Sequence, residues 1–466
     1  TTQFAYDNAR RLRRVESRLS HGPAATAGQW ITFEFDGAGH PVLETHASRD
    51  APGSELVIER VFDAYDRLDT ITRGGITTDF DYNPDGTIAA RTDGNLQTET
   101  YGYDAFRRLT RTQRAGTVTM LVSYDSQGRQ RSVSDAEGHT TRYLHDDLGN
   151  RIQVDSPDGG TSTYTHNGSG QVISQVDAKG EQSTFSYDAA GRLTAVDRSG
   201  ADDDIAYEYD RCANGVGRVC AITTGWGHSI RYGWNAIGQL SSVTTDEGQL
   251  SYGYGPQGTL TSIRYPSGRT VLFDIDGGGL PVQIRLRSET GTDSILVDDI
   301  RYSALGRPVE WRFANGLQTT IELDGRQRAL AIDVTGLPSW RAGAYDGNDN
   351  LLEMDDGTDS FTFAYDAMDR LVRATSDTSD LGIAYDGAGN RLSTHLNGET
   401  WLGSYEEGSN RLAHYAGKSY HLDPNGNTTT VHVDGLLERR YVYSGHNRLI
   451  EVLDGLSASS IATYAY

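Results

Sequence analysis

Polar and apolar residues alternate over short stretches of the chain, and turns rich in Asp and Gly separate these stretches. Phe185-Ser186-Tyr187 leads into one such turn, and Leu193-Thr194-Ala195-Val196 leads out of it. Because successive side chains of a strand point to opposite faces of a sheet, this alternation predicts strands with one buried face. Helical periodicity is nearly absent, and Gly or Pro interrupts any stretch long enough to form a helix. The pattern therefore predicts an all-β protein.

One motif recurs along the chain: an aromatic residue, Asp, two small residues, Gly, a residue of the type Arg, Asn or Gln, and an aliphatic residue. With the residue after the aromatic as a marker, 21 units run from residue 7 to residue 444, a mean spacing of about 22 residues. Chance does not produce such regularity, so the chain is predicted to be a repeat array. The residues that define the structural motif most clearly are Tyr187, Asp188, Gly191, Arg192, Tyr385, Asp386, Gly389, Tyr124, Asp125 and Gly128.

The motif itself predicts a hairpin turn. Asp at the start of a tight turn can accept a hydrogen bond from the backbone two residues on, and Gly supplies the positive φ that a turn with a bulge requires. A second turn signal follows later in each unit, as in Asp135–Gly138 and Asp177–Gly180. Two turns per unit predict two strands per unit, or about 42 strands in all.

A sheet of this size is predicted to wind, because open twisted sheets rarely exceed ~10 strands before they curl or split. At ~4.8 Å per strand, the strip is roughly 200 Å wide. A strip of that width closes around a lumen that side chains alone cannot fill. The expected architecture is a series of antiparallel β-hairpins that wind into a spiral, hollow β-shell.

The regular spacing predicts one continuous array over residues 1–466. A few intervals between units are longer than the rest, and enlarged loops are expected near residues 10–35, 37–62, 210–234 and 277–302. Residue 1 is Thr and not Met, so we expect the chain to be a fragment of a larger protein.

Composition and charge exclude several classes of partner. The chain has 42 Lys and Arg residues against 64 Asp and Glu residues, a formal net charge of -22, so it repels nucleic acid phosphates and anionic membranes. No apolar run approaches the ~18 residues that a membrane-spanning helix needs. We therefore expect no nucleic-acid partner and no membrane insertion by this segment.

The tyrosine–aspartate unit resembles the YD-repeat, or RHS-repeat, family over essentially the whole chain, and the lengthened turn from Tyr209 to Val219 is similar to one in bacterial members. The resemblance implies a large, hollow, spiralling β-shell, related to the Tc toxin cocoon. In secreted bacterial members such shells enclose a C-terminal toxin, and in animal teneurins a related shell mediates adhesion at the cell surface. It implies a bacterial protein that is secreted or on the cell surface, with a toxin or cargo domain beyond Tyr466 as partner. A component of a secretion apparatus and a surface glycan are further candidate partners.

One departure from the family concerns cleavage. Toxin-bearing members end their repeats with Asp-Pro-x-Gly-Arg and a following Asp-Pro, which free the cargo. The nearest segment here, Asp423-Pro424-Asn425-Gly426-Asn427, lacks the Arg, and no second Asp-Pro follows. We interpret this segment as an ordinary repeat turn and assign it no protease residues.

Catalytic and metal-binding patterns are weak, so we expect a non-enzymatic protein without a cofactor or metal. Two adjacent carboxylates could act as general acid and base, but neighbouring residues of a strand point to opposite faces, which favours solvated turn tips. Asp274-Ile275-Asp276-Gly277 matches only the first positions of a calcium loop. There is no nucleophile elbow, phosphate-binding loop or cysteine with a dedicated base. The adjacent acids are Asp146-Asp147, Asp202-Asp203-Asp204, Asp298-Asp299, Asp355-Asp356 and Glu406-Glu407.

Aromatic and arginine side chains have a structural interpretation. Tyrosines recur two residues apart, as in Tyr207 and Tyr209, and cross-strand packing is the favoured role, with sugar binding by exposed rings as the alternative. Arginines at the turn exits are expected to lie over a neighbouring ring or to pair with the Asp of an adjacent unit. These arginines are Arg108, Arg129, Arg192 and Arg370.

The two cysteines flank the lengthened turn. If that turn closes a hairpin, Cys212 and Cys220 lie on opposing strands within disulfide range. The sequence predicts a local disulfide, with free buried thiols as the alternative.

Three functions remain from the sequence. The favoured one is a non-enzymatic shell that encapsulates and delivers a C-terminal toxin. The second is an adhesin or carbohydrate-binding surface protein, suggested by 26 tyrosines. The third, a polysaccharide-acting enzyme, needs a cleft with two carboxylates about 5 to 10 Å apart.

Overall fold

All regular secondary structure in the described residues is β-strand. The computed structural model describes residues 2–18, 28–198 and 204–464, and it contains 43 strands there. Over these residues, nothing helical is long and apolar enough to cross a membrane. The all-β fold of repeated antiparallel hairpins, and the expectation of about 42 strands, are confirmed.

The strands form two compact units, and each unit joins two distant stretches of the chain. We call these stretches the first pass and the second pass of the unit. Unit 1 consists of residues 1–100 and 249–379, and unit 2 consists of residues 101–248 and 380–466. The prediction of one continuous array over residues 1–466 stays a prediction beside this division.

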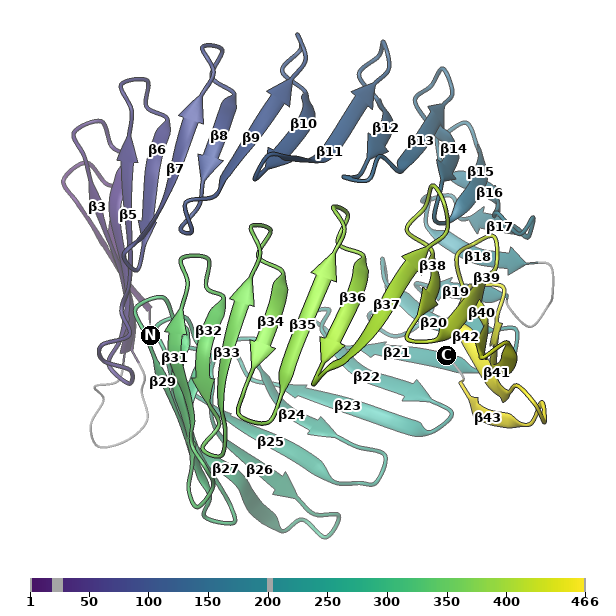
Figure 1. Cartoon of the computed structure of the whole chain (residues 1–466). Coiled ribbons are helices and arrows are strands. Elements are labelled where there is room, and N and C mark those ends of the chain that lie inside the picture. Colours follow the sequence, from purple (N-terminus) through teal and green to yellow (C-terminus); the bar gives the residue numbers. More distant parts are fainter. Residues whose placement is uncertain (1, 19–27, 199–203, 465–466) are drawn as a thin grey trace. The chain divides into compact units, whose positions relative to one another are not determined.

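Unit 1 contains the following strands (Figure 1). Its first pass has β1 (Thr2–Tyr6), β2 (Leu12–Arg18), β3 (Gly28–Phe35), β4 (Pro41–Ser48), β5 (Leu56–Phe62), β6 (Leu68–Arg73), β7 (Ile76–Tyr82) and β8 (Ile88–Thr92). Its second pass has β24 (Leu260–Arg264), β25 (Thr270–Ile275), β26 (Pro281–Arg287), β27 (Asp293–Tyr302), β28 (Pro308–Phe313), β29 (Gln318–Leu323), β30 (Ala329–Val334), β31 (Trp340–Tyr345), β32 (Leu351–Asp355), β33 (Ser360–Tyr365) and β34 (Leu371–Thr375).

Unit 2 is built in the same way. Its first pass has β10 (Leu109–Arg114), β11 (Thr117–Tyr124), β12 (Gln130–Ser134), β13 (Thr140–His145), β14 (Arg151–Ser156), β15 (Gly160–His166), β16 (Val172–Val176), β17 (Gln182–Tyr187), β18 (Leu193–Arg198), β19 (Ile205–Tyr209), β20 (Val219–Thr224), β21 (Ser229–Trp234) and β22 (Leu240–Thr245). Its second pass has β35 (Asp380–Tyr385), β36 (Arg391–Leu396), β37 (Glu399–Tyr405), β38 (Leu412–Tyr415), β39 (Lys418–Leu422), β40 (Thr428–Val433), β41 (Leu436–Tyr443), β42 (Leu449–Asp454) and β43 (Ser460–Thr463). Two further strands cross the borders between the units, β9 (Thr98–Tyr103) and β23 (Gly248–Tyr254).

Neighbouring strands pair antiparallel, and a bulge recurs at the motif tyrosine. In β17 and β18, Ser186 lies opposite Ala195 but Tyr187 lies opposite Leu193, so one residue is skipped. The register shifts in the same way at Tyr124 and at Tyr385. The skipped residues are Thr194, Arg131 and Leu392, and each lies two positions after the Arg or Asn that leaves the turn.

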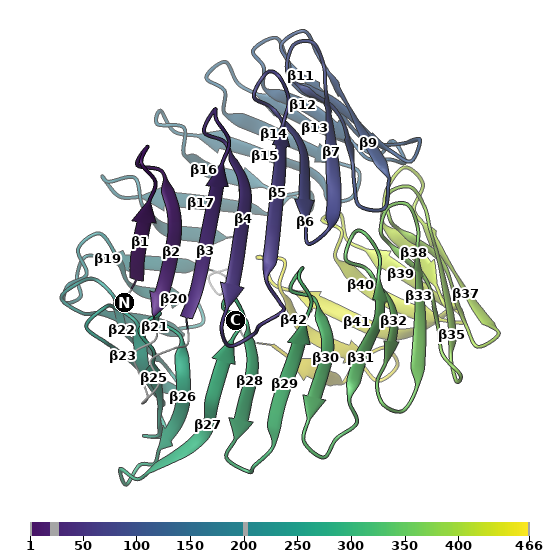
Figure 2. The same ribbon diagram turned by 90° about the vertical axis from the view of Figure 1, so that its left-hand side faces the viewer.

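The most buried residues of unit 1 lie where its two passes meet, because one sheet layer alone cannot enclose a core. Figure 2 shows the row β3–β5 above the row β27–β29, with the lower ends of one row next to the upper ends of the other. At this border Leu56 is 2% exposed and Ser303 is fully buried. The Ser48 hydroxyl donates to the carbonyl of Tyr302 at 2.9 Å.

Two of the long intervals between units are filled largely by long strands. Residues 37–62 contain β4, with 8 residues, and residues 277–302 contain β27, with 10 residues. The interval 210–234 holds the lengthened turn between β19 and β20. In the interval 10–35, residues 19–27 lie outside the described residues.

Candidate functional site

The motif turn is closed by its Asp side chain, as its chemistry predicts. Asp188 Oδ1 accepts hydrogen bonds from the backbone N–H of Ala190 and of Arg192, both at 2.9 Å. Gly191 has φ 78° and donates its N–H to the carbonyl of Asp188 at 3.0 Å. A side chain larger than hydrogen is disfavoured at such a φ. The turns at Asp125 and Asp386 are closed in the same way, with Gly128 at φ 85° and Gly389 at φ 93°.

The second oxygen of this Asp binds the side chain four residues on. Arg192 Nε donates to Asp188 Oδ2 at 2.7 Å, and Asn390 Nδ2 donates to Asp386 Oδ2 at 2.8 Å. The backbone N–H and the guanidinium of Arg192 hold the pKa of Asp188 below its ordinary value. A carboxylate with several donors keeps its charge down to a lower pH.

The motif tyrosine ties each unit to the preceding one. The Tyr187 hydroxyl donates to the carbonyl of Val172 at 2.8 Å, and the Tyr124 hydroxyl donates to the carbonyl of Leu109 at 2.8 Å. Each acceptor begins the strand that leaves the previous motif turn. The tyrosine side chains therefore pack against the preceding unit and hold the two units in register.

The arginines at the turn exits have a partner that the sequence analysis missed. Arg108 lies over the ring of Tyr124 at 4.4 Å, as expected for a neighbouring ring. Its ion pair, however, is with Asp104 of its own turn at 2.6 Å. Only the folded turn shows that the side chain four residues after the Asp points back to it. Arg192 pairs in both directions, with Asp188 and with Asp210 of the adjacent unit at 2.6 Å.

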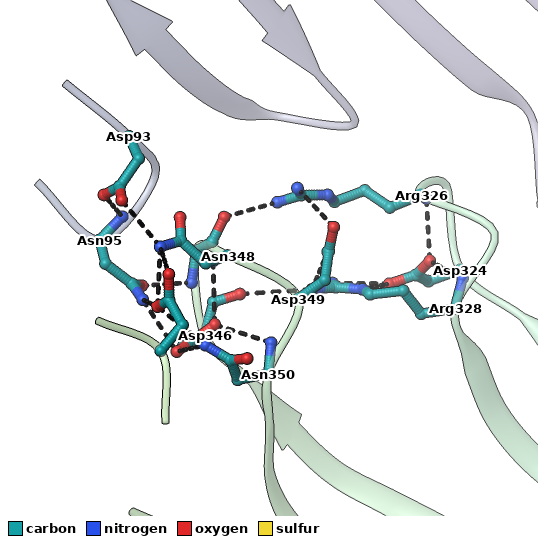
Figure 3. A network of polar contacts seen from close by, with 11 residues as sticks. Asp93, Asn95, Asp324, Arg326, Arg328, Asp346, Asn348, Asp349 and Asn350 are labelled. Carbon is teal, nitrogen blue, oxygen red and sulfur yellow. Dashed lines mark hydrogen bonds and ion pairs between the residues drawn. The ribbon is translucent and has the colours of Figure 1, made fainter. Parts of the chain in front are cut away.

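In each unit, turns of the first pass bind turns of the second pass, and we call these contacts the seam. In unit 1, Figure 3 shows Asn348 reaching Asp93 from the second pass. Asn348 Nδ2 donates to Asp93 Oδ2 at 2.9 Å, and Asn95 Nδ2 donates to Asp346 Oδ2 at 2.9 Å. The four residues form a reciprocal pair of Asp–Asn bonds. Asp93 and Asp346 also close their own turns.

Two glycines allow the passes to approach closely in unit 1. A Cβ on Gly94 would clash with the backbone of Gly347, and a Cβ on Gly347 would clash with the backbone of Gly94. On the second-pass side of the seam, Arg326 donates to the carbonyl of Gly347 at 3.2 Å and to Asp349 at 2.9 Å (Figure 3). The seam thus combines direct backbone contact with polar side chains.

The seam of unit 2 is centred on Asn410. Its Nδ2 donates to Asp135 at 2.8 Å, and its backbone N–H donates to Asp158 at 2.6 Å. Further along, Asn425 Nδ2 donates to Asp177 Oδ2 at 2.6 Å. In both units, hydrogen bonds of the seam join residues 248 to 275 apart in sequence. The separation therefore falls in the same range in both units.

No described group of three or more His, Cys, Asp or Glu side chains is arranged to hold a metal ion. At the weak calcium pattern, Asp274 pairs with Arg285 at 2.7 Å, and Asp276 closes its turn through the N–H groups of Gly278 and Leu280. The adjacent acids Asp298 and Asp299 pair with one arginine, Arg312. Asp202 and Asp203 lie outside the described residues.

The cysteines lie together in the lengthened turn of unit 2. The sulfurs of Cys212 and Cys220 are 2.09 Å apart, with Cα atoms 5.5 Å apart. Gly215 packs against both sulfurs, and a Cβ there would clash with them. The local disulfide between these two cysteines stays a prediction.

Two family models match parts of the chain, Teneurin YD-shell over residues 24–216 and RHS Repeat over residues 234–270. Among solved structures, the crystal structure of TcdB2-TccC3-TEV has a TM-score of 0.83, is 14% identical, and is matched over 98% of this chain and 29% of that chain. The crystal structure of TcdB2-TccC3-Cdc42 has a TM-score of 0.79 at 15% identity, over 98% of this chain and 30% of that chain.

A structure of the Photorhabdus luminescens Tc holotoxin pore has a TM-score of 0.68 at 14% identity, over 95% of this chain and 30% of that chain. This chain thus spans less than a third of the length of the solved chains it resembles. At these identities the likeness establishes the fold. No match is found among the curated proteins.

Proposed function

This chain belongs to the YD-repeat, or RHS-repeat, family, and from that premise we propose a function for it. The chain forms part of the wall of a hollow shell that encloses a C-terminal toxin. The toxin would be the segment that follows Tyr466 in a longer protein. The chain itself is a structural scaffold of the shell type. The enclosure of a cargo, the absence of catalysis and secretion from a bacterium belong to the proposal.

The seam is the observation that carries the proposal. In each unit, consecutive passes are joined edge to edge by reciprocal polar contacts such as Asn348 with Asp93 and Asn410 with Asp135. A wall around a guest needs such joints, because unsatisfied turn edges would leave slots for water and proteases. The close approach of Gly94 and Gly347 also supports a closed joint.

The comparisons support the proposal by analogy. The solved structures of this fold are named as assemblies of TcdB2 with TccC3, and one is a Tc holotoxin pore. We extend the role of a toxin component to this chain on the basis of the shared fold and the family. The net charge of -22 is consistent with a scaffold that stays soluble and avoids nucleic acid.

The test uses the longer protein. The coding sequence after Tyr466 first identifies the segment that follows. The purified longer protein and that segment alone are then treated with the same protease. We expect the segment to survive within the longer protein at a dose that degrades it when it is alone. A cleavable tag at the N-terminus of the longer protein is the control, since it must be removed at that dose. Absence of a segment after Tyr466 would contradict the proposal. Equal cleavage of the segment within the longer protein and of the segment alone would also contradict it.

Exposed aromatic rings support one second candidate, a glycan-binding adhesin. Tyr65 and Phe106 at motif turns are both 79% exposed, and Trp226 is 64% exposed. Stacking of sugars on such rings would place binding on the turn edges. The test is a glycan array probed with the chain and with a variant that lacks these three rings. An adhesin of this kind should bind glycans on the array, and the variant should lose that binding.

A further inference from the structure

One motif turn of unit 1 differs from its sister turns in the hydrogen bonding of its buried Asp carboxylate. Asp276 is 7% exposed, and its Oδ1 accepts the N–H of Gly278 at 2.7 Å and of Leu280 at 2.9 Å. These two bonds are the same as those made by Asp188. Its Oδ2 is buried and has no hydrogen-bond partner. An ionised oxygen left in this state is costly, because burial removes its water.

The cause lies in the residue four positions on. In sister turns that residue is polar and donates to Oδ2, as Arg192 does to Asp188 and Asn390 does to Asp386. Here it is Leu280, which has no donor. The rest of the unit is regular, since the Tyr302 hydroxyl donates to the carbonyl of Pro281 at 2.5 Å. Sister turns in which Arg fills this position are those at Asp7, Asp63, Asp104, Asp125, Asp188, Asp324 and Asp366.

The same carboxylate lines a pocket. The pocket has a volume of about 1060 Å³ and lies between β25, β26 and β27 of the second pass and Asp50 of the first pass. Its lining contains five Asp and two Arg side chains, so its charge is negative. Among them, Arg285 pairs with Asp274 at 2.7 Å. The pocket therefore combines room, negative charge and an unused acceptor.

A second acid, Asp50, also lines the pocket. Burial raises the pKa of the Asp50 carboxyl above its ordinary value, and the negative charge of Asp276 adds to the rise, while Arg301 acts against it. Arg301 itself is held by Glu310 at 3.0 Å. A positive group entering the pocket would relieve the repulsion between Asp50 and Asp276.

We propose that this pocket binds the guanidinium group of an arginine side chain from another polypeptide, with Asp276 Oδ2 as the principal acceptor. The chain itself provides the precedent, because arginine occupies the corresponding acceptor in sister turns at 2.6 to 2.7 Å. A guanidinium matches a carboxylate in shape and keeps its charge at all relevant pH values. The described residues offer no three-ligand group for a metal ion, which favours an organic cation. This inference does not depend on the proposed function.

The binding test uses N-acetyl-arginine amide as the probe and titrates it into the chain. N-acetyl-citrulline amide, which has the same shape without the charge, is the matched probe. We expect the arginine probe to bind at least about 10-fold more tightly than the citrulline probe, as a charge-assisted hydrogen bond requires. Equal binding of the two probes, or no binding of the arginine probe, overturns the proposal. Displacement of the arginine probe by stoichiometric Ca²⁺ would also overturn it, because the site would then be a metal site.

Asp276→Asn is the first variant, and it keeps the turn. Asn stands at the same motif position in the units at Asn167 and Asn235, where its Oδ1 closes the turn as Asp does. We expect Asp276→Asn to weaken binding of the arginine probe by about 10-fold or more. Asp125→Asn makes the same change in a turn of unit 2 and is the control, which should bind as the unmodified chain does. Unchanged binding in Asp276→Asn overturns the proposal.

Leu280→Arg is the second variant, and its readout includes stability. It restores the residue that sister turns use, so the new guanidinium should occupy Asp276 Oδ2. We expect a higher unfolding temperature and loss of binding of the arginine probe. If Leu280→Arg is less stable and still binds the arginine probe, the probe does not bind at Asp276 Oδ2, and the proposal is wrong.

Discussion

At the residue scale, the charge pair between Asp and Arg in a motif turn is a pH-dependent contact. Arg192 donates to Asp188 and to Asp210, and the Arg192 side chain together with the N–H of Gly217 lowers the pKa of Asp210 to about 2. In the unfolded chain an Asp titrates near 3.9. Because the folded value is the lower one, the pair stabilises the protein above about pH 4, and this stabilisation is lost as the pH falls towards 2.

The first prediction concerns Arg192→Leu, a change that the repeat itself carries at Leu280. We expect the variant to unfold at a lower temperature than the unmodified chain at pH 7. The difference should shrink as the pH is lowered from 4 to 2, because both Asp partners become protonated in the two proteins. Thermal unfolding followed by circular dichroism over this range is the measurement. A difference that stays constant with pH would show that Arg192 acts through packing alone.

At the element scale, each hairpin unit is specified by few residues. The Tyr187 hydroxyl, the Asp188 carboxylate and Gly191 each make contacts that the sequence pattern predicts, because they lie within one turn or between adjacent units. The pairing of Arg108 with its own Asp104 was not predicted. It depends on the direction in which the side chain at the turn exit points, and that direction follows from the fold of the turn.

The second prediction concerns the lengthened turn between β19 and β20. We expect Cys212 and Cys220 to be joined in the protein produced under oxidising conditions. Non-reducing peptide mapping should give one linked fragment, and reduction should cost about 2 to 3 kcal/mol of stability for a loop of this length. The double variant Cys212→Ser, Cys220→Ser is the control and should not respond to a reductant. Alkylation of both thiols in the unreduced native protein would contradict the bridge.

At the scale of the whole molecule, the seam was beyond the reach of sequence analysis. Asn410 and Asp135 are 275 residues apart, and their meeting depends on a small twist and bend per strand summed over many strands. No local pattern contains that sum. One signal was available, since Asp93 and Asp177 are followed four residues later by Gln97 and Glu181 and not by Arg. The Oδ2 atoms of these two Asp side chains are the ones that Asn348 and Asn425 bind.

The third prediction tests the seam through Asn410→Ala. The variant leaves Asp135 and Asp158 without the donors that Asn410 supplies through its side chain, so we expect a loss of about 1 to 3 kcal/mol. Hydrogen exchange should accelerate in the turns at residues 135–139 and 156–160. Asn150→Ala is the control, because Asn150 donates to Asp146 within its own turn. Equal effects of the two variants on these turns would show that the seam contributes nothing of its own.

The separation of 248 to 275 residues between seam partners has a consequence for how such a chain can change in length. Loss or gain of one hairpin between residues 135 and 410 would shift every later turn by one place, as a deletion shifts a reading frame. Asn410 would then lose its present pairing with Asp135 and Asp158. The number of hairpins between seam partners is therefore fixed by the contacts that the partners make.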